Sequence, residues 1–271
     1  MYSPSDFYYV HKDKSTPSQG WDCISKENHA GNVLFVSKYR TPRGRFGLVE
    51  ATLEGMSRCC GIDYDYFVFL SGQCYPIKTL SYIKEKLGER SVAYLVNFRL
   101  PSKSNWMDEN FGLDRINYFY FKYWKVVVRI PRLYRSLPYS LAPYGGSLYF
   151  CLPKRFTEYV LNFVSSHPKI IQFYRYAHIP DEMFFHTIIM NSPYKSEVVN
   201  DHKRYFNWVN GGHASVLTRE NLHELVESDK WFAMKFDTSV DEDILDLLDR
   251  QIGECSSTRA SSSGTKGRSL T

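Results

Sequence analysis

The sequence has no apolar stretch long enough to span a membrane. Its most apolar runs, such as Tyr66–Leu70, have the length of a β-strand, whereas a transmembrane helix needs about 20 consecutive apolar residues. The N-terminus also lacks the apolar core of a signal peptide, because Ser3, Pro4 and Asp6 interrupt it. We therefore expect a soluble, cytoplasmic protein, and peripheral contact with a membrane surface stays open.

Patterns for disulfides, zinc and nucleic acid are missing as well. The chain has six cysteines, at positions 23, 59, 60, 74, 151 and 255. They form neither a CxxC pair nor a Cys/His spacing of the zinc type, so we expect reduced, mostly buried thiols and no metal. The net charge of +5 fits a phosphorylated ligand but is too small for a nucleic-acid partner, and two of these charges lie after Gly253.

What the sequence does contain is an ordinary soluble composition with many aromatic rings. Hydrophobic residues make up 43%, charged residues 23% and aromatic residues 16% of the 271 positions. This predicts a single domain over residues 1–252, followed by a Ser-rich, disordered polar tail over 253–271. The rings fit either core packing or platforms for a sugar or a base.

Short β-branched and aromatic runs alternate with helical spacing along the chain. Strands are predicted at 7–11, 33–37, 66–70, 92–97 and 148–152, and helices at 47–60, 79–87, 155–165 and after Pro180. This alternation predicts an α/β fold with a mostly parallel central sheet flanked by helices. Ligands of such sheets bind at the carboxyl ends of the strands.

Residues 115–139 break this alternation. The segment is packed with aromatic rings and cations and contains no Asp or Glu. It is consistent with a lid over a sugar site or with a peripheral membrane patch for a lipid-linked substrate. A connecting segment whose rings pack over the core explains it as well.

The strand at 66–70 is followed by Ser71, Gly72 and Gln73. A metal-dependent nucleotide-sugar transferase places a pair of aspartates at this point, since divalent cations prefer carboxylate oxygens. Asp63 and Asp65 precede the strand instead and are interpreted as a solvated turn. The chain therefore lacks the expected metal-binding pair.

The segment 178–186 contains a candidate general base. Pro180 suits a first helical turn, where Asp181 and Glu182 are favoured by the helix dipole. A carboxylate held there beside apolar residues could accept a proton, although a plain acidic turn fits the same spacing. His178 and His186 flank Glu182 at equal spacing, but Pro180 places His178 outside the helix and disfavours a metal site.

Two further segments carry candidate ligand contacts. Trp208 is either a sugar platform or a core ring. Lys235, enclosed by Phe232, Met234 and Phe236, is placed to meet a phosphate as a point charge, although a surface lysine is the common alternative. The pair Thr218 and Asn221 resembles a helix cap.

Taken together, these motifs resemble the core-2/I-branching β-1,6-N-acetylglucosaminyltransferase family, which includes the peptide-O-xylosyltransferases, and its bacterial-type members in particular. The resemblance rests on YYVHKDKS at 8–15, YDYFVFLSGQCYPIKT at 64–79, GGSLYFCLPKRFTEYVLNF at 145–163, IPDEMFFHTIIMNS at 179–192 and WFAMKFD at 231–237. It implies a GT-A fold and an inverting, metal-independent transfer from a UDP-sugar to an acceptor hydroxyl.

The resemblance also implies roles for individual residues. Glu182 matches the catalytic base, and Lys235 matches the cation that neutralises the diphosphate in place of a metal. Trp208 matches an acceptor-contacting tryptophan. The remaining matches are Gly146 and Ser147, in the GS step before a central strand near the acceptor, and His11 and Asp13, in the H-x-D step near the nucleotide. Tyr149 and Trp124 are further aromatic candidates for contacting sugar.

The sequence departs from the family pattern in two places. Animal members carry an arginine, the partner of the lysine, where this chain has His213, so Arg204 is the nearest alternative for the second diphosphate cation. Family members also carry a strand and a helix before the H-x-D step, and here only ten residues precede His11. We expect that N-terminal strand to be missing.

The leading hypothesis is a metal-independent transferase that needs no cofactor. It moves a sugar, by family default N-acetylglucosamine, from a UDP-sugar to a hydroxyl of a glycan or lipid-linked saccharide. The alternative is a non-catalytic, glycan- or nucleotide-binding remnant of such an enzyme.

Overall fold

A computed structural model describes residues 3–17, 31–106, 109–123, 126–209 and 213–263 of the chain. The chain divides into two compact units. The larger unit comprises Tyr2–Phe67 and Val92–Asn200, and the smaller unit comprises Val68–Ser91 and Asp201–Thr271. Each unit is described by itself, and the single domain expected over residues 1–252 stays a prediction.

A four-stranded sheet forms the centre of the larger unit. Its order is β3 (Tyr66–Val68), β8 (Tyr144–Pro153), β5 (Ala93–Arg99) and β9 (Val198–Val199). The sheet interior is apolar, since Leu95, Phe150 and Leu152 are fully buried. The α/β class is therefore confirmed.

The strand directions are mixed rather than mostly parallel. Strand β5 pairs with β9 in parallel but with β8 antiparallel. The segment between β5 and β8 explains this direction. The N–H of Leu100, directly after β5, donates to the carbonyl of Pro143, directly before β8, at 3.0 Å, so the two ends of the segment lie side by side. Strand β8 then returns beside β5 in the opposite direction, as an antiparallel connection requires no crossover helix.

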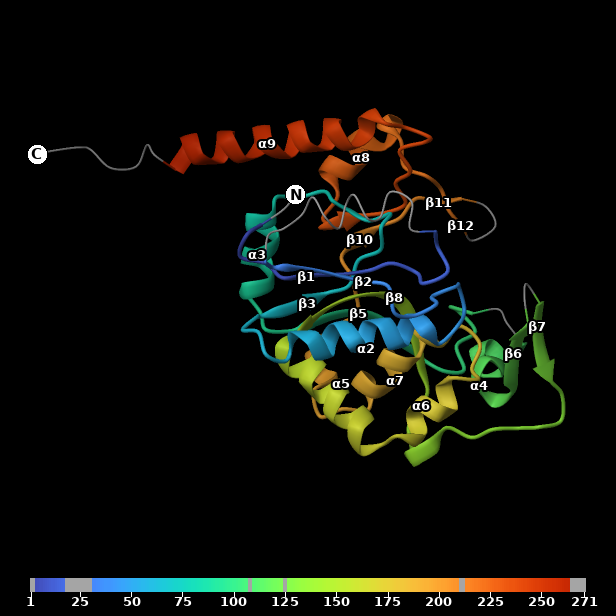
Figure 1. Cartoon of the computed structure of the whole chain (residues 1–271). Helices are drawn as coiled ribbons and strands as arrows, with labels where there is room; N and C mark the ends of the chain where they lie inside the picture. The colour runs from blue at the N-terminus through green and yellow to red at the C-terminus, as the bar shows by residue number, and fades with distance from the viewer. Residues whose placement is uncertain (1–2, 18–30, 107–108, 124–125, 210–212, 264–271) are drawn as a thin grey trace, which may run out of the picture. The chain divides into compact units, whose positions relative to one another are not determined.

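Helices gather beside this sheet in the larger unit (Figure 1). They are α2 (Gly47–Cys59), α4 (Asp114–Asn117), α5 (Lys154–Ser166), α6 (Lys169–Tyr174) and α7 (Phe184–Met190), with short 3-10 turns η1 (Glu109–Gly112), η2 (Pro138–Ser140), η3 (Pro180–Glu182) and η4 (Lys195–Glu197). Helix α5 follows Pro153 and buries Phe156 and Val160, which lie one turn apart on the same face.

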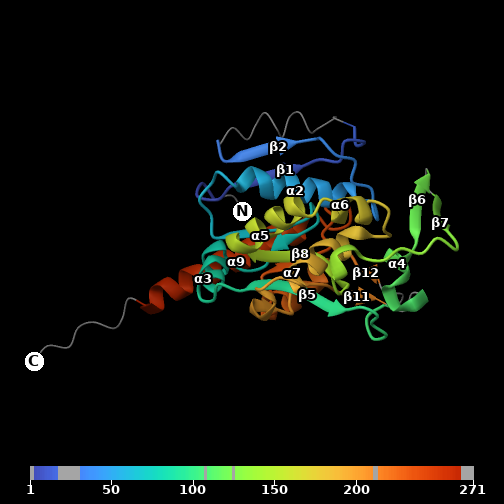
Figure 2. The same ribbon diagram turned by 90° about the horizontal axis from the view of Figure 1, so that it is seen from below.

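Two strand pairs complete the larger unit. Strand β1 (Tyr8–His11) pairs in parallel with β2 (Val33–Val36), and the ring of Tyr9 packs so closely on α2 that a Cβ at Gly55 would lie 2.9 Å from it. Strands β6 (Phe119–Tyr123) and β7 (Val126–Ile130) form an antiparallel hairpin. Both views show this hairpin as an arm extending from the helices of its unit (Figures 1 and 2).

The smaller unit has its own apolar core. Its three-stranded sheet has the order β10 (Arg204–Tyr205), β13 (Phe232–Ala233) and β4 (Tyr75–Pro76). The other elements are α3 (Leu80–Gly88), β11 (Trp208–Val209), β12 (His213–Ala214), η5 (Arg219–Asn221), α8 (Leu222–Glu227) and α9 (Asp243–Ser263). Thr218 and Asn221 form the expected capping box at η5.

Helix α9 differs from the tail expected after Gly253. Ile244, Leu248 and Ile252 lie on one face of this helix and pack with Ile77 and Phe236 in the core of the smaller unit. A helix fixed by this face continues through Gly253 to Ser263, since one glycine costs only about 1 kcal/mol in a helix. The helix thus runs beyond residue 253, where the sequence predicted the start of a disordered polar tail, and the tail over 253–271 stays a prediction.

None of the helices in the described ranges combines the length and the hydropathy that a bilayer span requires. Of the cysteines in these ranges, Cys59 and Cys151 are buried thiols, Cys74 is half-buried and Cys60 is exposed.

Candidate active site

Glu182 lies at the end of η3, directly before helix α7 in the larger unit. The turn is built on an unusual backbone: Ile179 adopts the left-handed conformation with φ +50° and ψ +57°. A β-branched residue rarely adopts this conformation, and such strain is concentrated at functional sites. The strained turn aligns the acidic pair Asp181 and Glu182 at the start of α7.

Arg115 holds the Glu182 carboxylate in place. Its Nη1 lies 2.8 Å from Oε2 of Glu182, and the two side chains are 9% and 31% exposed, respectively. The backbone carbonyl of Arg115 also accepts a hydrogen bond from the N–H of His178 at 2.8 Å. Arg115 thus fixes both the carboxylate and the chain that leads to it, while the carboxylate stays accessible.

The guanidinium of Arg115 is itself held by the ring of Trp106. Its central carbon lies 3.6 Å from the centre of that ring, and Phe98 meets the same ring edge-on at 4.9 Å. Two glycines make room for the indole: a Cβ would lie 2.3 Å from it at Gly112 and 2.4 Å at Gly145. Close packing therefore determines where Arg115 points.

Asp181 is a second carboxyl group beside Glu182, and it is buried. Its Oδ1 has no hydrogen-bond partner among the described residues. Burial, and after it the charge of Glu182, raise the pKa of Asp181 to about 7. Near neutral pH this group can therefore carry a proton, while its half-buried neighbour Glu182 is held by a cation.

A cavity of about 430 Å³ lies next to this cluster in the larger unit. Its lining includes Arg115, Ile179 and His178, together with Tyr120 and Val127 from the β6–β7 hairpin. The rings of Tyr120 and His178 are stacked, with centres 5.0 Å apart. The cavity offers an aromatic surface and charged groups, which is the combination that sugar hydroxyls and rings contact.

The predicted acceptor positions on β8 are tightly packed. A Cβ at Gly146 would lie 1.9 Å from the carbonyl oxygen of Val96 and 2.7 Å from the ring of His186. The carbonyl of Ser147 accepts a hydrogen bond from Nε2 of His186 at 2.8 Å, and burial lowers the pKa of His186 to about 4. Tyr149 is buried in the same strand.

The predicted nucleotide residues lie together where β1 and β2 end. Nε2 of His11 accepts the backbone N–H of Tyr39 at 3.1 Å, and burial lowers the pKa of His11. Asp13 accepts the backbone N–H groups of Ser15 at 2.6 Å and of Thr41 at 2.7 Å. Burial alone would raise the pKa of Asp13, but these bonds outweigh it and lower the pKa to about 2. His11 and Asp13 thus connect the loop after β1 to the loop after β2, which contains Tyr39 and Thr41.

Lys235 follows β13 in the smaller unit, beside the Ser71–Gln73 turn. The N–H of Phe236 donates to the carbonyl of Gln73 at 3.0 Å, so the lysine lies next to this turn. The Lys235 ammonium makes no hydrogen bond or ion pair with any described residue, whereas its positive charge contributes to lowering the pKa of Asp237. A cation without an internal counter-ion is suited to an anionic ligand.

Arg204 is buried in the same unit, with its guanidinium on backbone carbonyls. Nη2 donates to the carbonyl of Phe69 at 2.6 Å, and Nη1 donates to that of His202. Arg204 therefore anchors the end of β3, from which the Ser71–Gln73 turn departs. This placement favours a positioning role over direct contact with a diphosphate.

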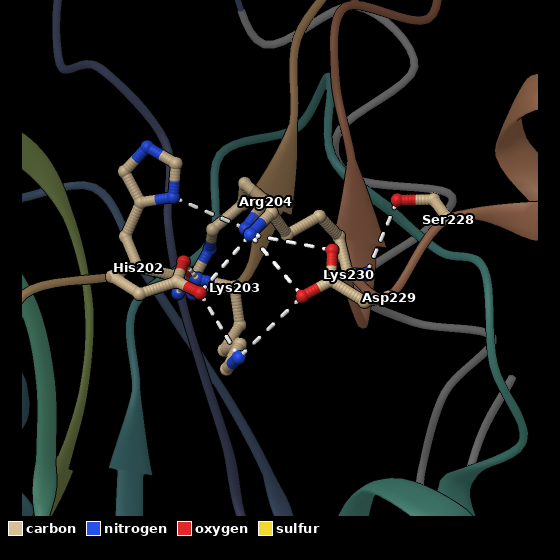
Figure 3. A network of polar contacts seen from close by, with 7 residues as sticks. His202, Lys203, Arg204, Ser228, Asp229 and Lys230 are labelled. Atoms are coloured by element: carbon tan, nitrogen blue, oxygen red, sulfur yellow. Dashed lines mark hydrogen bonds and ion pairs between the residues drawn. The ribbon is translucent and has the colours of Figure 1, made fainter.

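A network of charges surrounds this anchor (Figure 3). Asp201 forms ion pairs with Lys203 at 2.9 Å and Lys230 at 3.0 Å. Burial would raise the pKa of Asp201, but its hydrogen bonds with Lys203 and Lys230 lower it to about 2. Lys203 and Lys230 thus pair with Asp201, whereas Lys235 forms no ion pair with a described residue.

Trp208 and His213 lie on the β11–β12 hairpin of the smaller unit. The backbone of Val209 pairs with that of His213, and Trp208 is exposed and stacks on Phe206 with ring centres 5.3 Å apart. Trp124, the remaining aromatic candidate, lies outside the described residues. The larger unit thus brings together Glu182 and the acceptor positions of β8, and the smaller unit contains Lys235, Arg204 and Trp208.

Sequence reasoning missed Trp106 and Arg115. Their partners are far away along the chain, because Arg115 meets Glu182 across 67 positions. The sequence shows only a glycine at position 112, and the structure explains it by a positive φ of 92° and close contact with Trp106.

A sequence model described as "Branch: Core-2/I-Branching enzyme" matches residues 1–229 of the chain. This chain belongs to the Core-2/I-Branching enzyme family. The match confirms the resemblance drawn from the motifs and agrees with the expected GT-A fold. Core-2/I-Branching enzymes are glycosyltransferases, so the chain belongs to a family of enzymes.

Individual members of the family show the same relationship at lower identity. The chain is 28% identical to Xylosyltransferase 1 of Homo sapiens and of Canis lupus familiaris over 280 residues. It is 27% identical to Xylosyltransferase 2 of Rattus norvegicus over 282 residues. These alignments cover 92% of this chain but only 28% to 31% of each relative, so the chain spans less than a third of their length.

Proposed function

We propose that this chain transfers a sugar from a UDP-sugar to a hydroxyl group of a glycan or lipid-linked saccharide, with inversion and without a metal ion. The observation that carries the proposal is the Glu182 carboxylate, which is partly accessible and is held at 2.8 Å by Arg115, a residue that lines a cavity of about 430 Å³. Family membership supplies the reaction class.

Glu182 acts as the general base in this proposal. It removes the proton from the acceptor hydroxyl while that oxygen forms a bond to the anomeric carbon of the donor. The bond between the anomeric carbon and the diphosphate oxygen breaks on the opposite side, and UDP leaves. Proton transfer by a positioned base contributes about 10²- to 10⁴-fold to such a rate.

Lys235 stabilises the negative charge of the leaving diphosphate. Its ammonium has no ion pair among the described residues, and the turn beside it, Ser71–Gln73, contains no carboxylate to compete for it. A fixed cation at a developing negative charge supplies what a divalent metal supplies in other transferases.

The donor sugar is proposed to be N-acetylglucosamine, with xylose as the competing choice. The motifs match a family that includes N-acetylglucosaminyltransferases, whereas the relatives described above are named xylosyltransferases. The discriminating experiment compares release of UDP from UDP-N-acetylglucosamine and UDP-xylose, with a panel of saccharide acceptors.

The mechanism is tested with the same assay in excess EDTA. We expect full activity in EDTA and a fall of at least 100-fold in Glu182→Gln, whereas Glu158→Gln, an exposed carboxylate on α5, serves as the matched control and keeps wild-type activity. Loss of activity on chelation would refute metal independence, and full activity of Glu182→Gln would refute the role of the base.

A second candidate function is supported by Arg204. Its guanidinium is occupied by the carbonyls of Phe69 and His202, and His213 stands where animal members carry an arginine. With one diphosphate cation fewer, the chain could bind a nucleotide or glycan without turning it over. Calorimetry that detects UDP binding, together with no product from any donor, would favour this alternative.

A further inference from the structure

Strand β8 contains a bulge where it pairs with β5. The register of the two strands shifts between the pair Leu95–Phe150 and the pair Asn97–Gly146. A single residue of β5 therefore lies opposite residues 147–149 of β8. Extra residues of this kind leave the regular ladder and redirect their side chains, and bulges are frequent next to active sites. The bulge of β8 starts directly after Gly146.

The first residue of the bulge, Ser147, is held from helix α7. Nε2 of His186 donates to the carbonyl of Ser147 at 2.8 Å, and His186 is fully buried. Because burial lowers the pKa of His186 to about 4, the ring is neutral near pH 7 and carries its one proton on Nε2. Its Nδ1 is buried and has no hydrogen-bond partner among the described residues. The ring thus makes one directed bond, and that bond goes to the bulge.

Two further side chains at the end of α7 hold the chain that enters β8. Oγ1 of Thr187 accepts the N–H of Tyr144 and donates to the carbonyl of the same residue, both at 3.2 Å. The amide of Asn191 accepts the N–H of Ala142 at 3.0 Å and donates to its carbonyl at 2.8 Å. These two side chains and His186 form the α7 clamp on the main chain that enters β8.

The α7 clamp starts from the element that follows the candidate base. Glu182 ends η3 directly before α7, and both η3 and α7 pack against β8. On β8, the clamp fixes the main chain of Ser147 but not its side chain. Ser147 is half-buried, and its hydroxyl makes no hydrogen bond with any residue that the structure describes. A hydroxyl on a fixed main chain is suited to a directed bond with a ligand.

We propose that His186 is a positioning residue for the acceptor: it fixes the bulge of β8, and through the bulge the Ser147 hydroxyl, which bonds to the acceptor saccharide. The ring itself does not contact the acceptor, since it is fully buried. Because the same helix follows Glu182, the α7 clamp also sets this contact relative to the base. The inference rests on the proposed function, since it concerns the acceptor of that reaction.

Steady-state kinetics with saturating UDP-sugar test the proposal. The acceptor is the saccharide of the panel from which wild-type protein releases UDP fastest. Ser147→Ala should raise the KM for this acceptor about fivefold and leave kcat within about twofold, because one neutral hydrogen bond contributes about 2- to 12-fold to binding. His186→Leu, which lacks the donor, should have the same effect. His186→Gln, whose amide nitrogen replaces Nε2 as donor, should restore the KM to within about twofold of wild type.

The double variant separates positioning from a general loss of stability. If His186 acts through Ser147, His186→Leu should change the KM by less than about twofold when Ser147→Ala is already present, since such effects are not additive. Thr157→Val is the matched control: the fully buried hydroxyl of Thr157 donates to the carbonyl of Lys154 at 2.7 Å, and its loss should lower stability without changing the KM. If circular dichroism shows that His186→Leu is unfolded, Thr187→Val replaces it.

Nuclear magnetic resonance of protein with isotope-labelled histidine tests the clamp without turnover. We expect the ring proton of His186 on Nε2 near pH 7, with the signal assigned by its loss in His186→Gln. A proton on Nδ1 alone would contradict the bond to Ser147. Calorimetric titration with UDP should give the same affinity for wild type, Ser147→Ala and His186→Leu, because the inference concerns the acceptor only.

Additive effects of Ser147→Ala and His186→Leu, or an unchanged KM in both single variants, would overturn the positioning role. Weaker UDP binding in these variants would also contradict it. Wild-type protein that turns over no saccharide of the panel would instead refute the proposed function, and acceptor positioning with it. The position of the ring proton would then still show whether the α7 clamp forms.

Discussion

The Glu182 carboxylate owes its position to side chains that neighbour it only in space. Trp106 supports the guanidinium of Arg115 at 3.6 Å, and Arg115 holds Oε2 at 2.8 Å. A planar guanidinium stacks on an indole and donates in a fixed direction, which an ammonium cannot do. We therefore interpret Arg115 as a positioning residue for Glu182.

Arg115→Lys keeps the charge but loses the stacked, directional contact. A small displacement of a catalytic group can cost about 100-fold in rate, so we expect kcat to fall roughly 10- to 100-fold. The KM for the UDP-sugar should stay unchanged, because Arg115 does not contact the donor in this proposal. Steady-state kinetics measure both constants, and a variant with wild-type kcat would contradict the positioning role.

The matched control for this prediction is Arg58→Lys. Arg58, which is itself exposed, pairs with the half-buried Glu54 at 2.9 Å on α2. Exposed pairs contribute only about 0–1 kcal/mol, so this control should change neither kcat nor stability appreciably.

Asp181 makes the stability of the fold dependent on pH. Its pKa is raised from 3.8 to about 7 by burial and then by Glu182, so the folded protein keeps a proton that the unfolded chain releases above pH 3.8. The unfolded state therefore binds fewer protons, and the stability contributed by this group falls as pH rises towards 7, by about 1.4 kcal/mol for each pH unit.

Asp181→Asn removes this titration, so the unfolding free energy of the variant should lack the decrease with rising pH that Asp181 causes in wild type. We expect the difference in unfolding free energy, variant minus wild type, to be larger at pH 7 than at pH 5. Urea unfolding at the two pH values measures it. The fully exposed Asp63, changed to Asn, is the control, and a difference that does not depend on pH would refute the buried, protonated state of Asp181.

At the scale of elements, Gly146 fixes the distance between β8 and its neighbours. Its missing side chain lets β8 approach Val96 of β5 and His186 of α7. Gly146→Ala forces backbone and a buried ring apart, and overpacking of this kind costs about 1–3 kcal/mol. We expect a loss of stability at the upper end of this range in urea unfolding.

Gly72→Ala provides the comparison, because an added Cβ there would meet nothing within 4 Å. Equal stability of the two variants would show that β8 can relax at no cost. The result also separates packing from the acceptor contact that the motif implies for Gly146. A purely ligand-binding role would change the KM for the acceptor and leave the unfolding free energy unchanged.

At the scale of the whole molecule, the two proposed catalytic residues belong to different units. Glu182 is part of the larger unit and Lys235 of the smaller unit. Lys235→Met should weaken UDP binding by roughly tenfold or more, since it removes a charge-assisted contact of about 1.5–3 kcal/mol. Glu182→Gln should leave UDP binding unchanged, because the base acts on the acceptor.

Calorimetric titration with UDP distinguishes these two variants. Lys84→Met, an exposed lysine on α3, controls for the general loss of positive charge. Weakened UDP binding in both Glu182→Gln and Lys235→Met would contradict the division of roles that we propose.

The sequence by itself determined the α/β class, the capping box at Thr218 and Asn221, and the family, because these depend on local periodicity and on motifs that are continuous along the chain. It did not predict that Trp106 and Arg115 lie beside Glu182, that Arg204 is buried, or that β5 and β8 pair antiparallel. It also did not predict α9 as a separate helix, since the apolar face of this helix packs against residues that are distant along the chain. Contacts across many positions depend on chain closure and packing, and these were decided only by the tertiary structure.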